Sequence, residues 1–96
     1  MVDVCFLVTW NLNKERSNYD QARQAFIQHL ERYQNVKDPG LESVRWISSN
    51  ATAAQIDEDL RLKLDSNDRI FITKLNNREY QGWLNKDVWT WIDTRL

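Results

Sequence analysis

The amino-acid sequence predicts an α+β fold with a four-stranded antiparallel sheet, two helices between its strands and a third helix at the C-terminus. The apolar residues repeat with the period of a strand or a helix in the order strand, helix, strand, strand, helix, strand. The chain has 96 residues, of which 42% are hydrophobic, enough for one core. We therefore expect one domain over residues 1–96, with a core over 1–75 and a helix over 84–96.

The first strand is predicted over residues 2–10, where every second side chain is apolar. This series is Val2, Val4, Phe6, Val8 and Trp10. The alternate series includes Cys5 and Leu7, so the middle of the strand is apolar on both faces. That pattern is typical of a central strand covered on two sides.

The first helix is expected to begin after Ser17, which can act as N-cap with Asp20 three residues later. Its apolar stripe, at helical spacing, consists of Tyr19, Ala22, Phe26, Leu30 and Tyr33. His29 flanks this stripe and is expected at the helix surface or its boundary with the core. The turn sequence Asp-Pro-Gly then lies between two extended segments, so a hairpin is predicted with strands over 34–38 and 41–48.

The second helix is predicted to start at the N-cap Thr52, with Gln55 completing a capping box. Its stripe consists of Ala53, Ile56, Leu60 and Leu64. The last strand is expected over 69–75, and a final helix over 86–95 with Asn85 as its cap. The stripe of the final helix consists of Leu84, Val88, Trp91, Ile92 and Leu96. Trp89 falls off that stripe and is the tryptophan expected to be exposed or to contact another subunit.

This element order predicts the ferredoxin-like plan, in which two right-handed crossovers place both helices on one face of the sheet. The other face stays bare in that plan, yet the first and last strands are apolar on both faces. A bare apolar sheet is not tolerated on a soluble monomer. We therefore expect a homodimer that buries the open sheet face and involves the C-terminal helix.

The composition argues against several classes of protein function. Thirteen basic and 14 acidic residues give a formal charge of −1, so wide nucleic-acid binding is not indicated, although a local basic patch remains open. One His, one Cys and two Gly argue against metalloprotease, thiol and P-loop chemistry. No apolar run approaches the length of a membrane span, and the N-terminus lacks the features of a signal peptide. A cytoplasmic protein without membrane contact, metal or cofactor is expected.

Four segments carry a resemblance to a known family: VTWNLNKERSNYD, SVRWIS, LDSNDRIFI and GWLNKDVWTWI. With these the chain resembles, over nearly its whole length, small bacterial proteins often labelled SinR-like. That group is similar in fold to the CRISPR-associated adaptation subunit and to VapD-type toxin ribonucleases. The resemblance implies a ferredoxin-like dimer whose first strand ends in an Asp near the interface, where a divalent metal would serve phosphodiester cleavage.

Here that position is Asn11, an amide without charge. Two such amides would leave the charge of Mg²⁺ uncompensated, and an amide cannot act as a general base. The leading hypothesis is therefore a dimeric binding protein without nuclease activity. Its candidate contacts with a nucleic acid or a protein partner are Asn11, Asn13, Lys14, Arg16 and Arg23, with a polar loop at Asp65, Asn67 and Asp68.

Two alternatives stay open at this point. The first is a metal-dependent endoribonuclease or endodeoxyribonuclease using Mg²⁺ or Mn²⁺, with Asn11, Asn13 and Asp68 rearranged around the ion. The second is a partner subunit in a toxin–antitoxin-like system. The loop over 65–68 also has a purely structural interpretation, because Asp and Asn bond their own backbone in turns.

Overall fold

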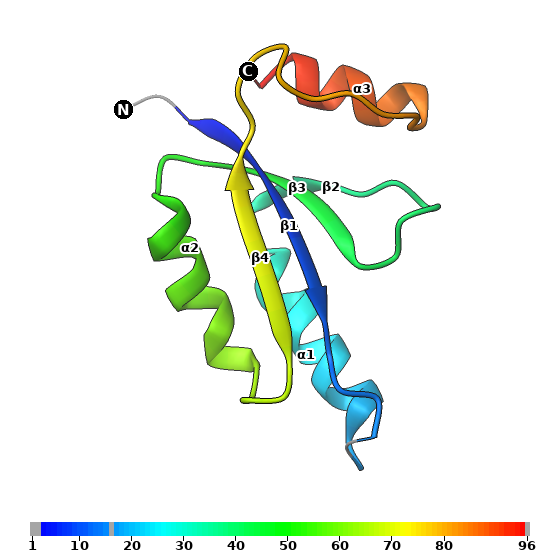
Figure 1. Cartoon of the computed structure of the whole chain (residues 1–96), viewed down its shortest axis with the longest axis vertical. Coiled ribbons are helices and arrows are strands. Elements are labelled where there is room, and N and C mark those ends of the chain that lie inside the picture. The colour runs from blue at the N-terminus through cyan, green and yellow to red at the C-terminus, as the bar shows by residue number, and fades with distance from the viewer. Residues whose placement is uncertain (1–2, 16, 96) are drawn as a thin grey trace.

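The computed structural model describes residues 3–15 and 17–95, and over these ranges the chain forms a four-stranded sheet and three α-helices (Figure 1). The elements in chain order are β1 Val4–Asn11, α1 Tyr19–Leu30, β2 Gln34–Val36, β3 Val44–Ser49, α2 Ala53–Leu60, the 3₁₀ turn Arg61–Lys63, β4 Arg69–Lys74 and α3 Lys86–Asp93. The predicted α+β class is confirmed.

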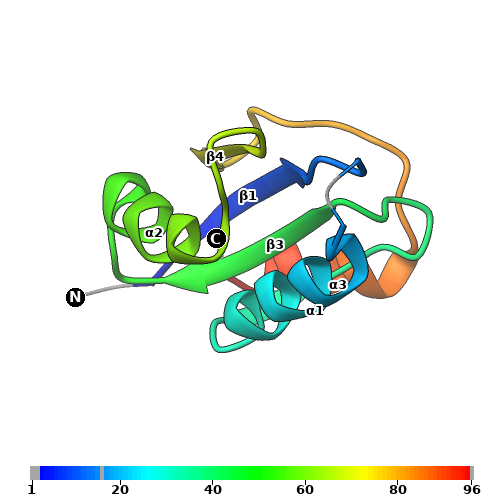
Figure 2. The same cartoon turned by 90° about the horizontal axis from the view of Figure 1, so that it is seen from below.

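The sheet is antiparallel throughout, with the strand order β2-β3-β1-β4. Strand β1 is central: Leu7 lies between Trp46 of β3 and Thr73 of β4. Viewed from below, β4, β1 and β3 follow one another across the molecule (Figure 2). The expectation of a covered central first strand is met, since six of its eight residues alternate between two packed faces.

One face of the sheet packs against both α1 and α2, and we call it the inner face. Its core joins Phe26 and Leu30 of α1 with Ile56 and Leu60 of α2, all without solvent exposure. The strand residues in this core are Phe6, Val8, Trp10 and Ile47. These core residues belong to the apolar stripes predicted from the sequence. The apolar pattern of each element therefore determines which of its faces is buried.

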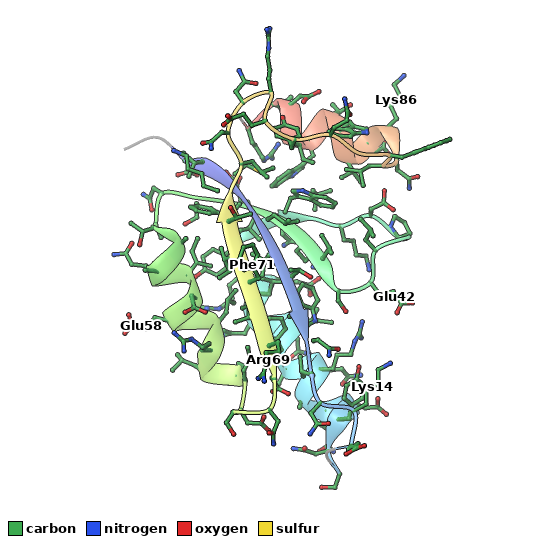
Figure 3. All side chains as sticks on the ribbon, in the orientation of Figure 1. Lys14, Glu42, Glu58, Arg69, Phe71 and Lys86 are labelled. Carbon is green, nitrogen blue, oxygen red and sulfur yellow. The ribbon has the colours of Figure 1, made fainter. Side chains whose placement is uncertain are left out.

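The opposite, outer face is covered only in part, by α3. Val88 and Ile92 of α3 pack against Cys5 and Trp46 in a second core cluster. Phe71 of β4 also points to the outer face, but it is 63% exposed. The C-terminal helix thus covers one end of this face and leaves the part around Phe71 open (Figure 3).

Several predicted boundaries need correction. Helix α1 has Asn18 rather than Ser17 at its N-cap, and no side chain caps it by a hydrogen bond. The hairpin strands are shorter and shifted, Gln34–Val36 and Val44–Ser49, because Asp38 folds back on its own turn by accepting from the Gly40 N–H at 2.8 Å.

At the other helices, the capping box of Thr52 and Gln55 is confirmed. Asn85 does hold the N-cap position of α3, but its side chain makes no capping bond. Val2, in the first predicted strand, and Leu96, in the last predicted stripe, lie outside the described residues.

Candidate binding site at the end of β1

The candidate site is the corner where β1 ends and the chain turns towards α1. Asn11 is the last residue of β1, lies opposite Arg69 of β4 and is exposed. The next residue, Leu12, is only 3% exposed and belongs to the inner core, so it anchors the turn. A surface hollow here is lined by Asn11, Leu12, Asn13, Lys14, Glu15 and Asn67. We refer to it as the strand-end hollow.

Asp68 holds this corner to the loop before β4. Its carboxylate accepts a hydrogen bond from the Asn13 backbone N–H at 2.8 Å and another from the Asp65 N–H at 3.0 Å. The residue is 6% exposed, so both bonds lie in a largely dry environment. Buried carboxylates need such partners, and Asp68 therefore has a clear structural role.

The two loops at the corner are further ordered by short side-chain bonds to their own backbone. The Asn13 side-chain oxygen accepts from the Glu15 N–H at 3.0 Å, and the Asp65 carboxylate accepts from the Asn67 N–H at 2.8 Å. These are Asx-type turns, which Asp and Asn favour. The structural interpretation of the 65–68 loop thus accounts for Asp65 and Asp68, while Asn67 also lines the strand-end hollow.

The polar groups of the hollow are mainly amides, accompanied by the exposed side chains of Lys14 and Glu15. Beside it, the guanidinium of Arg69 donates to the backbone oxygens of Ser66 at 3.3 Å and Asp68 at 3.0 Å. Over the described residues, no three or more His, Cys, Asp or Glu side chains gather where they could hold a metal ion. The corner is suited to hydrogen bonding rather than to holding a hard cation.

The structure does not bring all the predicted contact residues together. Arg23 lines a different hollow, between α1 and the β2–β3 connection, which it shares with Lys37 and Arg45. The buried Arg45 is already paired there with Glu31 at 3.0 Å. The structure therefore does not bring Arg23 together with Asn11, Asn13 and Lys14 in the strand-end hollow. Arg16 lies outside the described residues.

The tryptophans are distributed differently from the prediction. Trp89 is half-buried and stacks on Tyr80, with ring centroids 6.1 Å apart. Trp83, in the segment between β4 and α3, is instead 96% exposed. Both line an apolar pocket of about 340 Å³ on the outer face, whose floor includes Leu7 and Trp46. The exposure of Trp83 was not predictable, since the segment before α3 follows no helical or strand period.

A polar cluster elsewhere ties α1 to α2. The Asp59 carboxylate accepts from the Tyr33 hydroxyl at 2.6 Å and pairs with His29 at 3.0 Å, and Arg32 is its third partner. Burial opposes the charged form of Asp59, but the Tyr33 hydrogen bond and the two nearby cations outweigh it and lower its pKa. Burial, and then Asp59, raise the pKa of Tyr33 to about 12. His29, predicted at the helix surface or boundary, is half-buried and belongs to an interhelical network.

Cys5 is fully buried, as expected for a small hydrophobe. Burial raises the pKa of its thiol to about 11, against a smaller lowering by Arg95. A thiol with such a pKa is almost entirely protonated near neutral pH, and only the thiolate is a good nucleophile. Cys5 therefore offers no reactive group to the candidate site.

The chain matches none of the family models or curated proteins with which it was compared. None of the helices in residues 3–15 and 17–95 has the length and apolar content that crossing a membrane requires. The assignment of function therefore depends on the chemistry of the corner and the exposed apolar surface.

Proposed function

We propose that this chain is a ferredoxin-like binding protein that acts as a homodimer and does not cleave phosphodiester bonds. The antiparallel order β2-β3-β1-β4, with α1 and α2 on one face, supports the ferredoxin-like plan. We also propose that the chain is related to the SinR-like proteins that it resembles. We further propose a cytoplasmic setting, because a reducing compartment suits a single, buried cysteine.

The proposal depends on one observation at the end of β1. Asn11 presents an exposed amide there, and the carboxylate of Asp68 in the neighbouring loop already accepts two hydrogen bonds. Asn11 supplies no negative charge and no basic group. Both oxygens of Asp68 accept backbone N–H groups, from Asn13 and Asp65. Each of these oxygens keeps a further lone pair, but a metal bound by Asp68 would compete with the N–H bonds that join the two loops. Binding is therefore the chemistry that the corner supports best.

A short stretch of nucleic acid is the partner that we propose for the strand-end hollow. Amide side chains of Asn11 and Asn67 can bond base edges or phosphate oxygens without a metal, and the Lys14 ammonium adds charge. With a formal charge of −1 for the whole chain, this contact has to be local, and with Lys14 as its cation it should weaken only modestly as salt rises.

The homodimer accounts for the open part of the outer face. Helix α3 already packs its own buried stripe, Val88 and Ile92, against the sheet of the same chain. What remains for a second copy is the region around Phe71, and the exposed Trp83 extends the apolar surface beside α3. Large exposed aromatic side chains are typical of interaction surfaces.

Fluorescence anisotropy with labelled single-stranded RNA and DNA at about 50 mM salt tests the binding proposal. We expect Lys14→Ala to weaken binding about three- to tenfold, because one phosphate contact is lost. Lys86→Ala is the matched control, since this exposed lysine starts α3 at the far end of the molecule (Figure 3). Binding that is equally weak for both variants, or absent in the unmodified protein, would refute the nucleic-acid proposal.

A further inference from the structure

Strand β4 forms one margin of the sheet, and its outward backbone groups can be assigned. The Leu75 N–H donates to the Cys5 oxygen at 2.9 Å, and Leu75 stands opposite Cys5 by extension of the β1–β4 register. Because hydrogen-bonded pairs alternate along an antiparallel ladder, residues 69, 71 and 73 also point their backbone groups at β1. The N–H and C=O groups of Ile70, Ile72 and Lys74 therefore point away from the sheet.

A second hydrogen bond supports this assignment independently. The Trp10 N–H donates to the Ser43 oxygen of the segment entering β3 at 3.2 Å, so Trp10 points its backbone at β3 and its neighbour Thr9 at β4. Thr9 lies opposite Phe71, which fits the inward direction of residue 71. Among the residues that the structure describes, no hydrogen bond joins the outward groups of β4 to another part of the chain.

Of the features that normally keep sheet edges apart, this edge has charged side chains only at its two ends, Arg69 and Lys74. Over its six residues, Arg-Ile-Phe-Ile-Thr-Lys, β4 has no proline and three consecutive apolar residues. Phe71 extends from its outer face with 63% of its surface exposed. An exposed apolar edge strand is a template for pairing with another strand.

We propose that β4 pairs antiparallel with β4 of a second copy, with Phe71 opposite Phe71 across a two-fold axis. In this register Ile70 of each copy lies opposite Ile72 of the other. The outward backbone groups of these residues then form the hydrogen-bonded pairs of the new ladder. The two four-stranded sheets then become one continuous sheet of eight strands. The inference depends on the homodimer proposed above and specifies its contact.

The residues of β4 favour this register and a second copy as the occupant. With Phe71 opposite itself, Phe pairs with Phe and Ile with Ile, and Thr73 comes opposite Arg69. A register shifted to place Ile72 opposite itself would instead pair Lys74 with Ile70 and Phe71 with Thr73. The strand is thus self-complementary in one register, as a two-fold interface requires.

Engineered cysteines test the register directly. Phe71 would form a non-hydrogen-bonded pair with its copy, where the Cα atoms are about 4.5 Å apart, close enough for a disulfide. Under mild oxidation we expect Phe71→Cys to give mostly covalent dimer on a non-reducing gel. Thr73→Cys, the matched control on the same face, should stay monomeric on that gel, because it would face Arg69. The native Cys5 is buried and does not interfere.

Light scattering on the unmodified protein separates the possible failures. A dimer in solution, together with equal crosslinking of the two cysteine variants or none of either, would overturn the β4 pairing but leave the homodimer standing. A monomer at about 100 μM would overturn both.

A proline variant probes the same edge without a disulfide. Lys74→Pro removes an outward N–H and leaves the β1–β4 ladder intact, whereas Lys74→Ala keeps that N–H. We expect the proline variant alone to raise the dimer dissociation constant about tenfold or more, since two bonds are lost per dimer. Equal dissociation constants for the two variants would contradict the proposed edge pairing.

Discussion

The Asp68 carboxylate accepts the backbone N–H of Asn13 at 2.8 Å, which joins two loops that are 55 residues apart in the sequence. Since the same carboxylate accepts from Asp65, one side chain fastens the turn after β1 to the loop before β4. An acid that does not line the hollow therefore joins the two loops that do.

Replacing Asp68 should be costly for stability. In Asp68→Asn the negative acceptor is lost and an amide NH₂ group can face a backbone N–H. Because hydrogen bonds to buried charged groups contribute about 1.5–3 kcal/mol each, we expect the free energy of unfolding to fall by about 2–4 kcal/mol. Urea denaturation followed by tryptophan fluorescence measures it. The nearby exposed Ser66→Ala should change stability by less than about 0.5 kcal/mol, and a similar loss in both would contradict the role of Asp68.

Asp38 makes a comparable connection on the other side of the molecule. Its carboxylate accepts from Gly40 in the hairpin turn at 2.8 Å and from the Asn85 N–H at the start of α3 at 2.7 Å. Asp38→Ala should therefore loosen α3 while α1 keeps its protection. Hydrogen exchange resolved by peptide should show faster exchange over residues 84–93 and little change over 19–30.

Glu42→Ala is the control for this experiment, because Glu42 is exposed in the same connection between β2 and β3 (Figure 3). Equal exchange of α3 in the Asp38 and Glu42 variants would show that Asp38 does not hold the helix in place.

The interhelical cluster around Asp59 predicts a dependence of stability on low pH. The pKa of Asp59 is lowered below its ordinary value of 3.8, so its contribution is fully present above about pH 4 and is lost as pH falls through the folded-state pKa. Unfolding free energies measured from pH 6 to pH 2 should fall more steeply for the unmodified protein than for Asp59→Asn. Parallel curves for the two proteins would contradict this coupling between α1 and α2.

Tyr33 predicts the corresponding behaviour at high pH. Its pKa is raised to about 12, so the neutral phenol that donates to Asp59 stabilises the fold below pH 10, and this contribution is lost as pH rises towards 12. A tyrosinate titration by ultraviolet absorbance should show a late-titrating group that disappears in Tyr33→Phe. An unchanged titration curve above pH 11 in that variant would refute the assignment.

The fold was largely predictable because its elements bury regular stripes. The alternation around Phe6 and Val8 and the helical spacing of Ile56 and Leu60 identified both sheet faces and the inner core. Turn chemistry was less decisive: Ser17 and Asn18 are both good N-cap residues, and only the tertiary position of α1 selects Asn18.

The site was predictable in part. Asn11, Asn13 and Lys14 lie together because they follow one another at the end of a strand, whereas Asn67 joins them through the β1–β4 pairing. Arg23 lines a different hollow, since the direction of a helical side chain depends on how the helix packs. The exposure of Trp83 could not be predicted, because its segment has no periodic pattern.

The most direct test of the central claim, binding without cleavage at Asn11, follows one labelled oligonucleotide in two ways. Single-stranded RNA and DNA are incubated with excess protein in Mg²⁺, in Mn²⁺ and in EDTA, and both anisotropy and product size are recorded. We expect the same increase in anisotropy in all three conditions, with the oligonucleotides intact. Cleavage products that require Mn²⁺ or Mg²⁺ and disappear in Asn11→Ala would contradict it.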